Sequence, residues 1–372
     1  MSRRTRAVFL RGGTSKGLFF HEADLPPAGP ARDALFCAAL GSPDPNERQL
    51  DGMGGGLSSL SKVVTVAPSG RPDCDIDYTF GQVAVNTAAV DYAANCGNLT
   101  SAVGPFAVDE GLVSVPDGMA SVRLFNTNST KRIVARFAVV GGRAVETGDQ
   151  ELPGVSGRAA PIRLAFLKPA GALTGRLLPT GRVVDGLRDE AGREVAASLV
   201  DAATACVFLR AADLGLEGTE SPDVLEAEPA LLSRMEELRR AGARAMGLDD
   251  SAASAPKIGI VAPPRQARCL DGRVLEPARM HVQVRMLSMG RPHRAVPLTA
   301  ALCLAAAADL DGSLVAQAAA PLAGDEDLQI AHPSGLLAVR ARRDEAGQGL
   351  AELEVVRTAR RLMEGAVLTP EE

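Results

Sequence analysis

Residues 8–26 read VFLRGGTSKGLFFHEADLP, and residues 197–215 read ASLVDAATACVFLRAADLG. Both stretches contain an apolar run, a turn of small residues, a second apolar run and then Ala-Asp-Leu, at a shift of 189 residues. Three further pairs of similar strings follow in the same order: SKVVTVAP and PKIGIVAP, LTSAV and LTAAL, VPDGMASVR and HPSGLLAVR. The shift grows along the chain to 217 residues, as small insertions in the second copy would produce. The chain is therefore predicted to contain two related halves.

A period of this length predicts two similar domains, because solenoid repeats recur every 20 to 50 residues or so. The polar, glycine-spaced stretch 182–194 is typical of a linker, and we expect domains over residues 1–185 and 186–372. Short β-branched runs predict strands, and one helix follows the third run in each half, at about 97–107 and 294–308. Each half is thus predicted to be an α+β unit with a central helix among mixed strands, and the terminal strand is a candidate for packing on the first domain.

The composition limits the class of protein. Of 372 residues, 46% are hydrophobic, which is enough for two cores, while aromatic residues make up 3% and the net charge is −5. We therefore expect no nucleic-acid partner. No apolar run has the length of a membrane span, no signal-peptide pattern is present, and the six scattered cysteines lack a C-x-x-C pair. These features favour a cytoplasmic protein without a membrane partner, and they are compatible with a homodimer.

The turn RGGTSKG at 11–17 is the first candidate binding element. It lacks the spacing of a P-loop, but Gly12 and Gly13 let backbone N–H groups approach a ligand closely. Thr14, Ser15 and Lys16 add further donors, which suits a carboxylate or a phosphate. The alternative is an ordinary glycine-rich hairpin turn.

A second candidate is DGMGGGLSSLSK at 51–62, where glycines and serines precede Ser61 and Lys62. The stretch fails the dinucleotide pattern G-x-G-x-x-G. A lysine held in a desolvated cleft has a lowered pKa and can act as a base. The alternative is a surface lysine at a strand edge, which is how we interpret its repeat partner Lys257.

The third candidate is Cys96, which stands between Asn95 and Gly97, with Asn98 following, where a helix is predicted to start. A thiol at a helix N-terminus faces unpaired N–H groups and the positive end of the helix dipole, which favour the thiolate. The alternative is a small buried cysteine beside a helix cap. In the second half, His293 precedes the predicted helix and is a candidate anion ligand or acid. The scattered histidines and cysteines predict no metal site.

A thiol at a helix N-terminus, a lysine across a cleft and loops rich in N–H and hydroxyl groups would form a proton-transfer site for an anionic substrate. Proton removal next to a carboxylate is difficult because that carbon acid is weak. The N–H groups near Gly97 and Gly12–Gly13 would therefore hold the resulting oxyanion. No cofactor fingerprint is present, and we expect no cofactor.

Eight strings occur in order along the chain: RGGTSKGLFF, GSPDPNERQLDGMGGGLSSLSK, DIDYTFGQV, NCGNLTSAVGPFAV, LLPTG, LSMGRPHRA, HPSG and RTARRLMEG. Together they resemble the 2-methylaconitate isomerase (PrpF) family, which includes oxalomesaconate tautomerases and methylitaconate isomerases. The resemblance implies the diaminopimelate-epimerase-like α+β fold, with two pseudo-symmetric domains that each wrap a central helix in mixed strands. It also implies cofactor-independent proton transfer that moves or cis-trans isomerises a C=C bond in small unsaturated di- and tricarboxylates.

The same resemblance implies that Lys62 and Cys96 are the catalytic pair, with either one as the base. It implies that Ser15 and Lys16 meet the substrate carboxylates, and that His293 does so more loosely. Two departures stand out: Leu60 replaces the usual threonine before Ser-Lys, and DAATA (201–205) stands where Asp-Ala-Gly-Asn-Pro is expected.

Two alternative functions remain at this stage. A racemase or epimerase of amino or hydroxy acids on the same fold would want a second cysteine facing Cys96, whereas the repeat register places Ala295 there. A non-catalytic accessory of an aconitase-like dehydratase would bind a carboxylate without exchanging protons.

Overall fold

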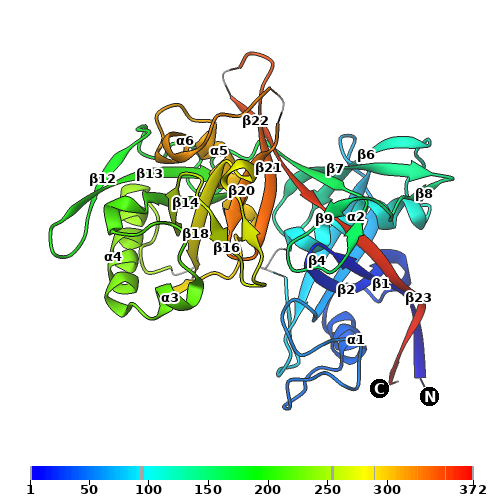
Figure 1. The fold of residues 1–372 in the computed structure, drawn as a ribbon. Coiled ribbons are helices and arrows are strands. Elements are labelled where there is room, and N and C mark those ends of the chain that lie inside the picture. Colours follow the sequence, from blue (N-terminus) through cyan, green and yellow to red (C-terminus); the bar gives the residue numbers. More distant parts are fainter. Residues whose placement is uncertain are drawn as a thin grey trace. The chain divides into compact units, whose positions relative to one another are not determined.

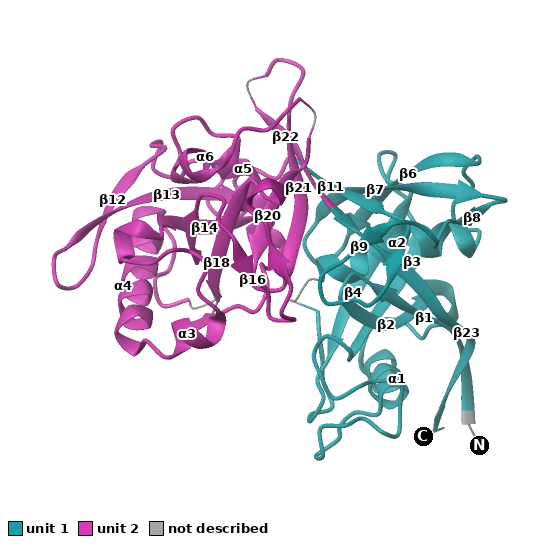
Figure 2. Ribbon diagram, in the orientation of Figure 1, with its two compact units in different colours: residues 1–167, 356–372 teal, residues 168–355 magenta. Residues whose placement is uncertain are grey.

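The computed structural model describes residues 2–92, 96–252, 255–288, 290–324, 326–347 and 349–370. The chain divides into two compact units, residues 1–167 with 356–372 and residues 168–355 (Figure 2). Each unit combines a mixed sheet with a central helix (Figure 1). The predicted α+β class is therefore confirmed.

The first unit contains helices α1 (Pro30–Leu40) and α2 (Gly97–Asp109) and the 3-10 turn η1 (Glu22–Asp24). Its strands are β1 (Ser2–Gly12), β2 (Ser15–His21), β3 (Lys62–Pro68), β4 (Ile76–Val83), β5 (Val90–Asp91), β6 (Gly118–Asn126), β7 (Lys131–Val140), β8 (Arg143–Ala144), β9 (Gln150–Glu151), β10 (Arg158–Ala159), β11 (Ile162–Leu167) and β23 (Ala359–Pro370). Neighbours along the sheet run β23-β1-β2-β3-β4-β6-β7-β11. The pairs β2–β3 and β4–β6 are parallel and the other pairs are antiparallel.

The second unit contains α3 (Pro222–Glu226), α4 (Pro229–Ala245), α5 (Leu298–Ala308) and α6 (Leu314–Ala318), with the 3-10 turns η2 (Ala212–Leu214) and η3 (Pro277–Arg279). Its strands are β12 (Asp185–Arg188), β13 (Glu194–Ala202), β14 (Thr204–Arg210), β15 (Lys257–Ala262), β16 (Ala267–Arg268), β17 (Val274–Leu275), β18 (Val282–Ser288), β19 (Arg291–Pro292), β20 (Leu328–His332), β21 (Gly335–Arg343) and most of β22 (Leu350–Arg357). Neighbours run β12-β13-β14-β15-β18-β20-β21-β22. Here β14–β15 and β18–β20 are parallel.

The two sheets share one topology. From β1 in the first unit and β13 in the second, the pairs run antiparallel, parallel, antiparallel, parallel and antiparallel. The central helix follows the fourth strand of the series in both units, α2 after β4 and α5 after β18. The predicted duplication is therefore visible in the strand order.

Both central helices are enclosed by their own sheets. Residues 99–108 of α2 and 300–307 of α5 are buried without interruption, which explains why their sequences are apolar on all sides. In the first unit, Phe19 packs on Phe106 of α2 with ring centroids 5.6 Å apart. Among the described residues, the structure contains no helix that is both long and apolar enough to cross a membrane.

Prolines stand at the start of two helices in the second unit. The second central helix begins at Leu298 rather than residue 294, and Pro297, with an extended ψ of 137°, is its N-cap. A second proline separates α3 from α4. Pro229 pushes Glu228 out of the helical region, to φ −114° and ψ 74°.

The observed division of the chain lies at residue 167 rather than at the expected residue 185. The intervening segment bonds to the second unit, since the Asp201 carboxylate accepts the N–H groups of Leu173 and Thr174 at 2.8 and 2.6 Å. At the other end, β23 pairs along β1 from Ser2 opposite Pro370 to Gly12 opposite Ala359. The chain end therefore completes the first unit.

A buried ion-pair cluster holds the C-terminal end of α2. Glu110, the C-cap residue, accepts hydrogen bonds from Arg361 of β23, from Arg6 of β1 at 2.7 Å and from His21 of β2 at 3.0 Å. Its side chain is 4% exposed. Burial alone would raise the pKa of Glu110, but the bonds from Arg361 and His21 outweigh it and lower that pKa.

We predict that Glu110→Gln lowers the free energy of unfolding by about 3 kcal/mol at pH 7, because it leaves buried cationic donors unmatched. The loss should shrink as the pH falls below about 4.3, since a carboxyl with a lowered pKa stabilises the fold only while it is ionised. Urea unfolding at pH 7 and at about pH 3, well below the unfolded pKa, measures both. The control is Glu151→Gln, whose pair with Arg158 is more than half exposed and should contribute less than about 1 kcal/mol. Equal losses at both pH values would contradict the prediction.

Candidate active site

The turn between β1 and β2 packs directly on the first turn of α2. A Cβ added to Gly12 would lie 2.7 Å from the Asn98 carbonyl oxygen and 2.9 Å from Cα of Leu99. Gly13 has a φ of +54°, and its added Cβ would lie 2.3 Å from Oδ1 of Asn98. Asn98 in turn donates from Nδ2 to the Thr14 hydroxyl at 3.0 Å. The structure thus brings together four predicted binding residues, Gly12, Gly13, Thr14 and Asn98. Both glycines are required because the backbone and side chain of α2 lie where a Cβ would be.

Cys96 is the N-cap of α2, as the sequence predicts. Its backbone is extended, its carbonyl accepts the Thr100 N–H at 3.2 Å, and Gly97 is the first helical residue. The side chain is 9% exposed, and its Sγ lies 3.8 Å from Oγ of Ser15. The thiol therefore stands at the positive end of the helix, beside a hydroxyl of the β1–β2 hairpin.

Ser15 and Lys16 lie on opposite faces of this hairpin, because successive strand residues alternate. Ser15, paired with Gly12, faces α2, whereas the Lys16 ammonium lies 5.4 Å from the centroid of the Phe9 ring. Phe9 belongs to the core cluster that includes α1. Of the two predicted carboxylate ligands, the structure brings only the Ser15 side chain to Cys96.

Lys62 is the first residue of β3 and is 7% exposed. Its Nζ donates to Oε1 of Gln82, its partner on β4, at 2.6 Å, and lies 4.9 Å from the centroid of the Phe80 ring. Burial lowers the pKa of Lys62, and an ionised Cys96 acts in the opposite direction. Lys62 is therefore a buried amine and not an exposed lysine at a strand edge.

The glycine- and serine-rich loop before Lys62 is organised from within by Gln49, a residue that sequence reasoning missed. The Gln49 carbonyl oxygen accepts the N–H groups of Gly55 and Gly56 at 3.1 and 3.0 Å, and its amide donates to Ser61 at 2.8 Å. The Ser61 hydroxyl is fully buried and donates to the Val83 carbonyl at 2.9 Å. This part of the loop thus fixes the position of Lys62, and a direct contact of Ser61 with substrate stays a prediction.

Two further buried groups interact with Cys96. Tyr78 of β4 bonds to the Thr100 hydroxyl at 2.9 Å, and burial raises the pKa of Tyr78 to about 12. Arg357, the last residue of β22, is 5% exposed, and burial lowers its pKa to about 10 while an ionised Cys96 opposes that shift. Sequence analysis did not single out Arg357, although it is the first residue of RTARRLMEG, one of the strings that carry the family resemblance.

Two remaining candidates, Asn95 and His293, stay predictions. Asn95 lies outside the described residues. His293 belongs to the second unit, where it is exposed and its Nδ1 accepts the Ala295 N–H at 3.1 Å. Its role toward a substrate stays a prediction.

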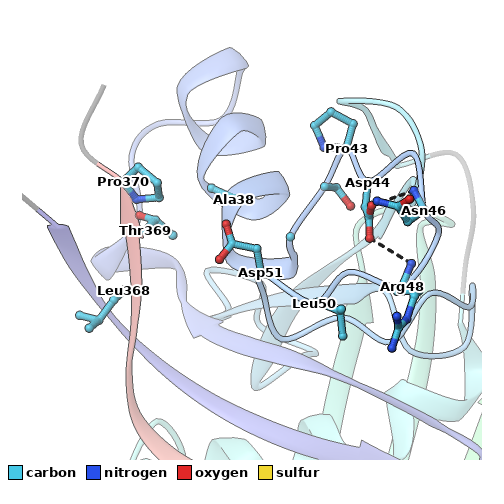
Figure 3. A pocket seen from close by; sticks show the side chains of 12 residues that line it. Ala38, Pro43, Asp44, Asn46, Arg48, Leu50, Asp51, Leu368, Thr369 and Pro370 are labelled. Atoms are coloured by element: carbon cyan, nitrogen blue, oxygen red, sulfur yellow. Dashed lines mark hydrogen bonds between the residues drawn. The ribbon is translucent and has the colours of Figure 1, made fainter.

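A groove of about 940 Å³ lies elsewhere on the first unit, between the end of α1, the loop 41–51 and the end of β23 (Figure 3). The Asp44 carboxylate in this groove accepts the N–H groups of Asn46 and Arg48 at 2.8 and 3.0 Å, within its own loop. Neither Lys62 nor Cys96 lines this groove. The acid–base groups, and not this groove, therefore define the candidate site.

The fold and these residues define a class of site before any comparison with known proteins. A buried amine, a thiol at a helix N-terminus and a buried guanidinium belong to one unit. Such a set can take a proton from an anionic carbon acid, stabilise the resulting charge and return a proton. The class is an acid–base catalyst.

Comparisons with known proteins agree with this class. The family model described as PrpF protein matches residues 2–370. A 2-methyl-aconitate isomerase of Shewanella oneidensis is 40% identical over 99% of this chain and 97% of its own length. A 4-oxalomesaconate tautomerase of Pseudomonas putida is 38% identical over 98% of this chain and 96% of its own length. The crystal structure of a methylitaconate-delta-isomerase superposes with a TM-score of 0.93 at 36% identity, covering 99% of this chain and 96% of that one.

The chain therefore belongs to the PrpF family. The expected family and the expected enzyme class, an isomerase, are confirmed. The racemase and accessory alternatives are not favoured.

We predict that Gly12→Ala lowers turnover by about tenfold or more, because the new methyl group meets the backbone of α2 and moves Cys96 relative to the hairpin. Overpacking of this kind should also cost about 1 to 3 kcal/mol of stability. The control is Gly70→Ala, where an added Cβ meets nothing within 4 Å. Initial rates and urea unfolding of both variants are the measurements, and unchanged turnover in Gly12→Ala would show that the close packing is dispensable.

Proposed function

We propose that this chain moves or cis-trans isomerises a carbon–carbon double bond in a small unsaturated di- or tricarboxylate, by removing one proton and returning one. The observation that carries this proposal is that one unit holds a buried amine, Lys62 at the start of β3, and a buried thiol, Cys96 at the N-terminus of α2. The names of the relatives supply candidate substrates: 2-methylaconitate, oxalomesaconate and methylitaconate.

The charges at the site favour an anionic substrate. Lys62 donates to a neutral amide and Arg357 donates to the Val356 carbonyl at 3.0 Å, and no carboxylate among the described residues bonds to either cation. Buried charges are normally paired, because an isolated one is costly to desolvate. A polycarboxylate would supply the missing negative charge.

The proton transfers follow from this arrangement. One member of the Lys62–Cys96 pair takes a proton from the carbon next to the conjugated acid, and the C–H electron pair moves into a dienolate. The N–H groups of the first turn of α2, which have no acceptor within the helix, and the cations Lys62 and Arg357 stabilise that charge. The other member then protonates the far carbon, which shifts the double bond, or the same carbon after rotation, which gives cis-trans isomerisation.

We also infer a cytoplasmic location. The six cysteines are buried free thiols, which fits a reducing compartment.

The direct test is proton NMR in deuterated water with cis-aconitate, 2-methylaconitate, oxalomesaconate and methylitaconate. We expect deuterium to enter at least one of these together with a moved or inverted double bond. Binding without exchange on every compound would overturn the proposal and favour an accessory that only binds carboxylates.

We predict that Lys62→Ala and Cys96→Ala each lower turnover by about 10² to 10⁴-fold, as expected for loss of a general acid or base. The matched control is Lys257→Ala, which removes the corresponding lysine at the start of β15 in the second unit. Circular dichroism checks that each variant folds. Full activity of Lys62→Ala would remove Lys62 from the catalytic pair.

A second prediction concerns Gln82, the neutral partner of the Lys62 ammonium. Gln82→Glu places a carboxylate on Nζ, which favours the charged amine and should raise the pH of one limb of the kcat/KM profile by about one unit or more. Movement of the acidic limb would make Lys62 the base, and movement of the basic limb would make it the acid. Gln82→Ala removes the same amide donors, which bond to Ser58 and Ser61, without adding charge. A profile that does not move in Gln82→Glu would contradict a role for Lys62 ionisation.

A further inference from the structure

Three cations stand in a row across three neighbouring strands of the first unit. In the register of the sheet, Arg11 of β1 lies opposite Lys16 of β2 and, on its other side, opposite Arg360 of β23. Directly opposed residues of antiparallel strands project from the same face, and like charges in such pairs destabilise a sheet. A row of three cations is therefore unfavourable unless an anion lies against it.

Two members of this row, Arg11 and Arg360, line a hollow of about 680 Å³ whose lining residues all belong to the first unit. Arg158 of β10 and Glu146 line it as well, so the hollow is lined by three guanidinium groups and one carboxylate. The chain as a whole has a net charge of −5. The hollow is therefore a local concentration of positive charge, which favours an anionic occupant.

The donors of the two opposed arginines are only partly used. Nη1 of Arg11 donates to the Gly13 carbonyl at 2.9 Å, to the Thr358 carbonyl at 3.1 Å and to the Thr358 hydroxyl at 3.0 Å. Within the described part of the chain, Nε and Nη2 of Arg11 have no hydrogen-bond partner, and the Arg360 side chain forms neither a hydrogen bond nor an ion pair. A guanidinium that is held in place and still has unused donors is suited to bind an oxyanion.

The carboxylate of the hollow does not neutralise this pair. Oε1 of Glu146 accepts the backbone N–H of Arg361 at 2.6 Å. Burial and the charge of Arg360 lower the pKa of Arg11, and Glu146 acts in the opposite direction without reversing the shift. The repulsion between the two arginines is therefore not balanced by the chain's own carboxylate.

The hollow is separate from the candidate active site but is bonded to the turn that helps to form it. Lys62 and Cys96 do not line the hollow. Arg11 holds the Gly13 carbonyl, and Gly13 lies so close to Asn98 that an added Cβ would be 2.3 Å from its Oδ1. An anion bound to Arg11 would therefore act on the turn that packs against the N-terminus of α2.

We propose that the hollow is a second anion-binding site of the first unit, in which Arg11 and Arg360 together hold a small carboxylate or phosphate. A planar guanidinium donates pairs of N–H groups to either anion, so both classes are recognised by the same chemistry. The bound anion cancels the repulsion between the two arginines and restrains Arg11, which in turn restrains Gly13. Occupancy of the site therefore stiffens the β1–β2 turn. The inference goes beyond the proposed isomerase function and does not depend on it.

Isothermal titration calorimetry with two probes, inorganic phosphate and succinate, tests the site. Neither probe has a C=C bond that the proposed reaction could move. The proteins compared are the unmodified chain, Arg360→Gln and the control Arg4→Gln. Arg360 is exposed, so its replacement should leave the fold intact. Arg4 is an exposed arginine of β1 that lies opposite Leu368, so its replacement removes the same charge outside the row.

We expect Arg360→Gln to weaken binding of at least one probe by about tenfold or more, because a charge-assisted hydrogen bond is lost. Arg4→Gln should change the affinity by less than about twofold, since solvent and salt screen an exposed charge outside the site. A response of succinate alone identifies a carboxylate site, and a response of phosphate alone identifies a phosphate site. No binding of either probe, binding that Arg360→Gln leaves unchanged, or an equal loss in Arg4→Gln would overturn the proposal.

A probe that also binds at the candidate active site is recognised with Lys62→Ala, which should leave the binding that depends on Arg360 unchanged. Hydrogen exchange of the Gly13 amide, followed by NMR, tests the link to the turn, because this N–H donates to the Thr358 carbonyl at 2.9 Å. A saturating probe should slow this exchange several-fold in the unmodified chain and not in Arg360→Gln. Unchanged exchange in the unmodified chain would refute the link. Neither measurement involves turnover, so a failed deuterium experiment would count against the isomerase function alone.

Discussion

The close approach of the β1–β2 turn to the first turn of α2 governs the arrangement of the site. Gly12 has no room for a side chain because the Asn98 carbonyl and the Leu99 Cα occupy that space. The contact brings Ser15 to the Cys96 thiol. Pairing of β1 with both β2 and β23 then extends the same geometry to the chain end, where Thr358 bonds to Gly13. One backbone contact therefore links the hairpin, the helix N-terminus and the segment carrying Arg357.

Electrostatics at this contact favours negative charge throughout. The N-terminus of α2, Lys62 and Arg357 all contribute positive potential. The Lys62 side chain bonds to the neutral amide of Gln82, and the Arg357 side chain bonds to the Val356 carbonyl. A site that builds up negative charge during reaction needs this imbalance before substrate arrives, because donors that are already in place need not reorganise. The stability of the unit comes from elsewhere, including the paired charges around Glu110 at the opposite end of the same helix.

Much of this could be predicted from the sequence, and the failures have physical causes. Repeated strings indicated the duplication, and the Asn-Cys-Gly-Asn string placed Cys96 at a helix start. The boundary of the units could not be predicted, because it depends on long-range bonds from Leu173 and Thr174 to Asp201. Arg357 could not be predicted as a site residue from the sequence, because most charged residues lie on the surface. Only the fold shows that this arginine is buried.

The second unit keeps the topology of the first without its chemistry, and the turn at DAATA shows how. In the β1–β2 hairpin two residues separate the closing pair of Gly12 and Ser15, whereas in β13–β14 only Ala203 stands between its neighbours. Ala203 adopts a φ of +60°, which an L-residue takes at a cost of about 1 to 2 kcal/mol. The nearby Asp201 carboxylate accepts the N–H groups of Leu173 and Thr174, in the segment that leads into the second unit. This carboxylate therefore has a structural role. A duplicated sheet can thus conserve its strand order while one turn packs on the N-terminus of a central helix and the other bonds to a preceding segment of its own chain.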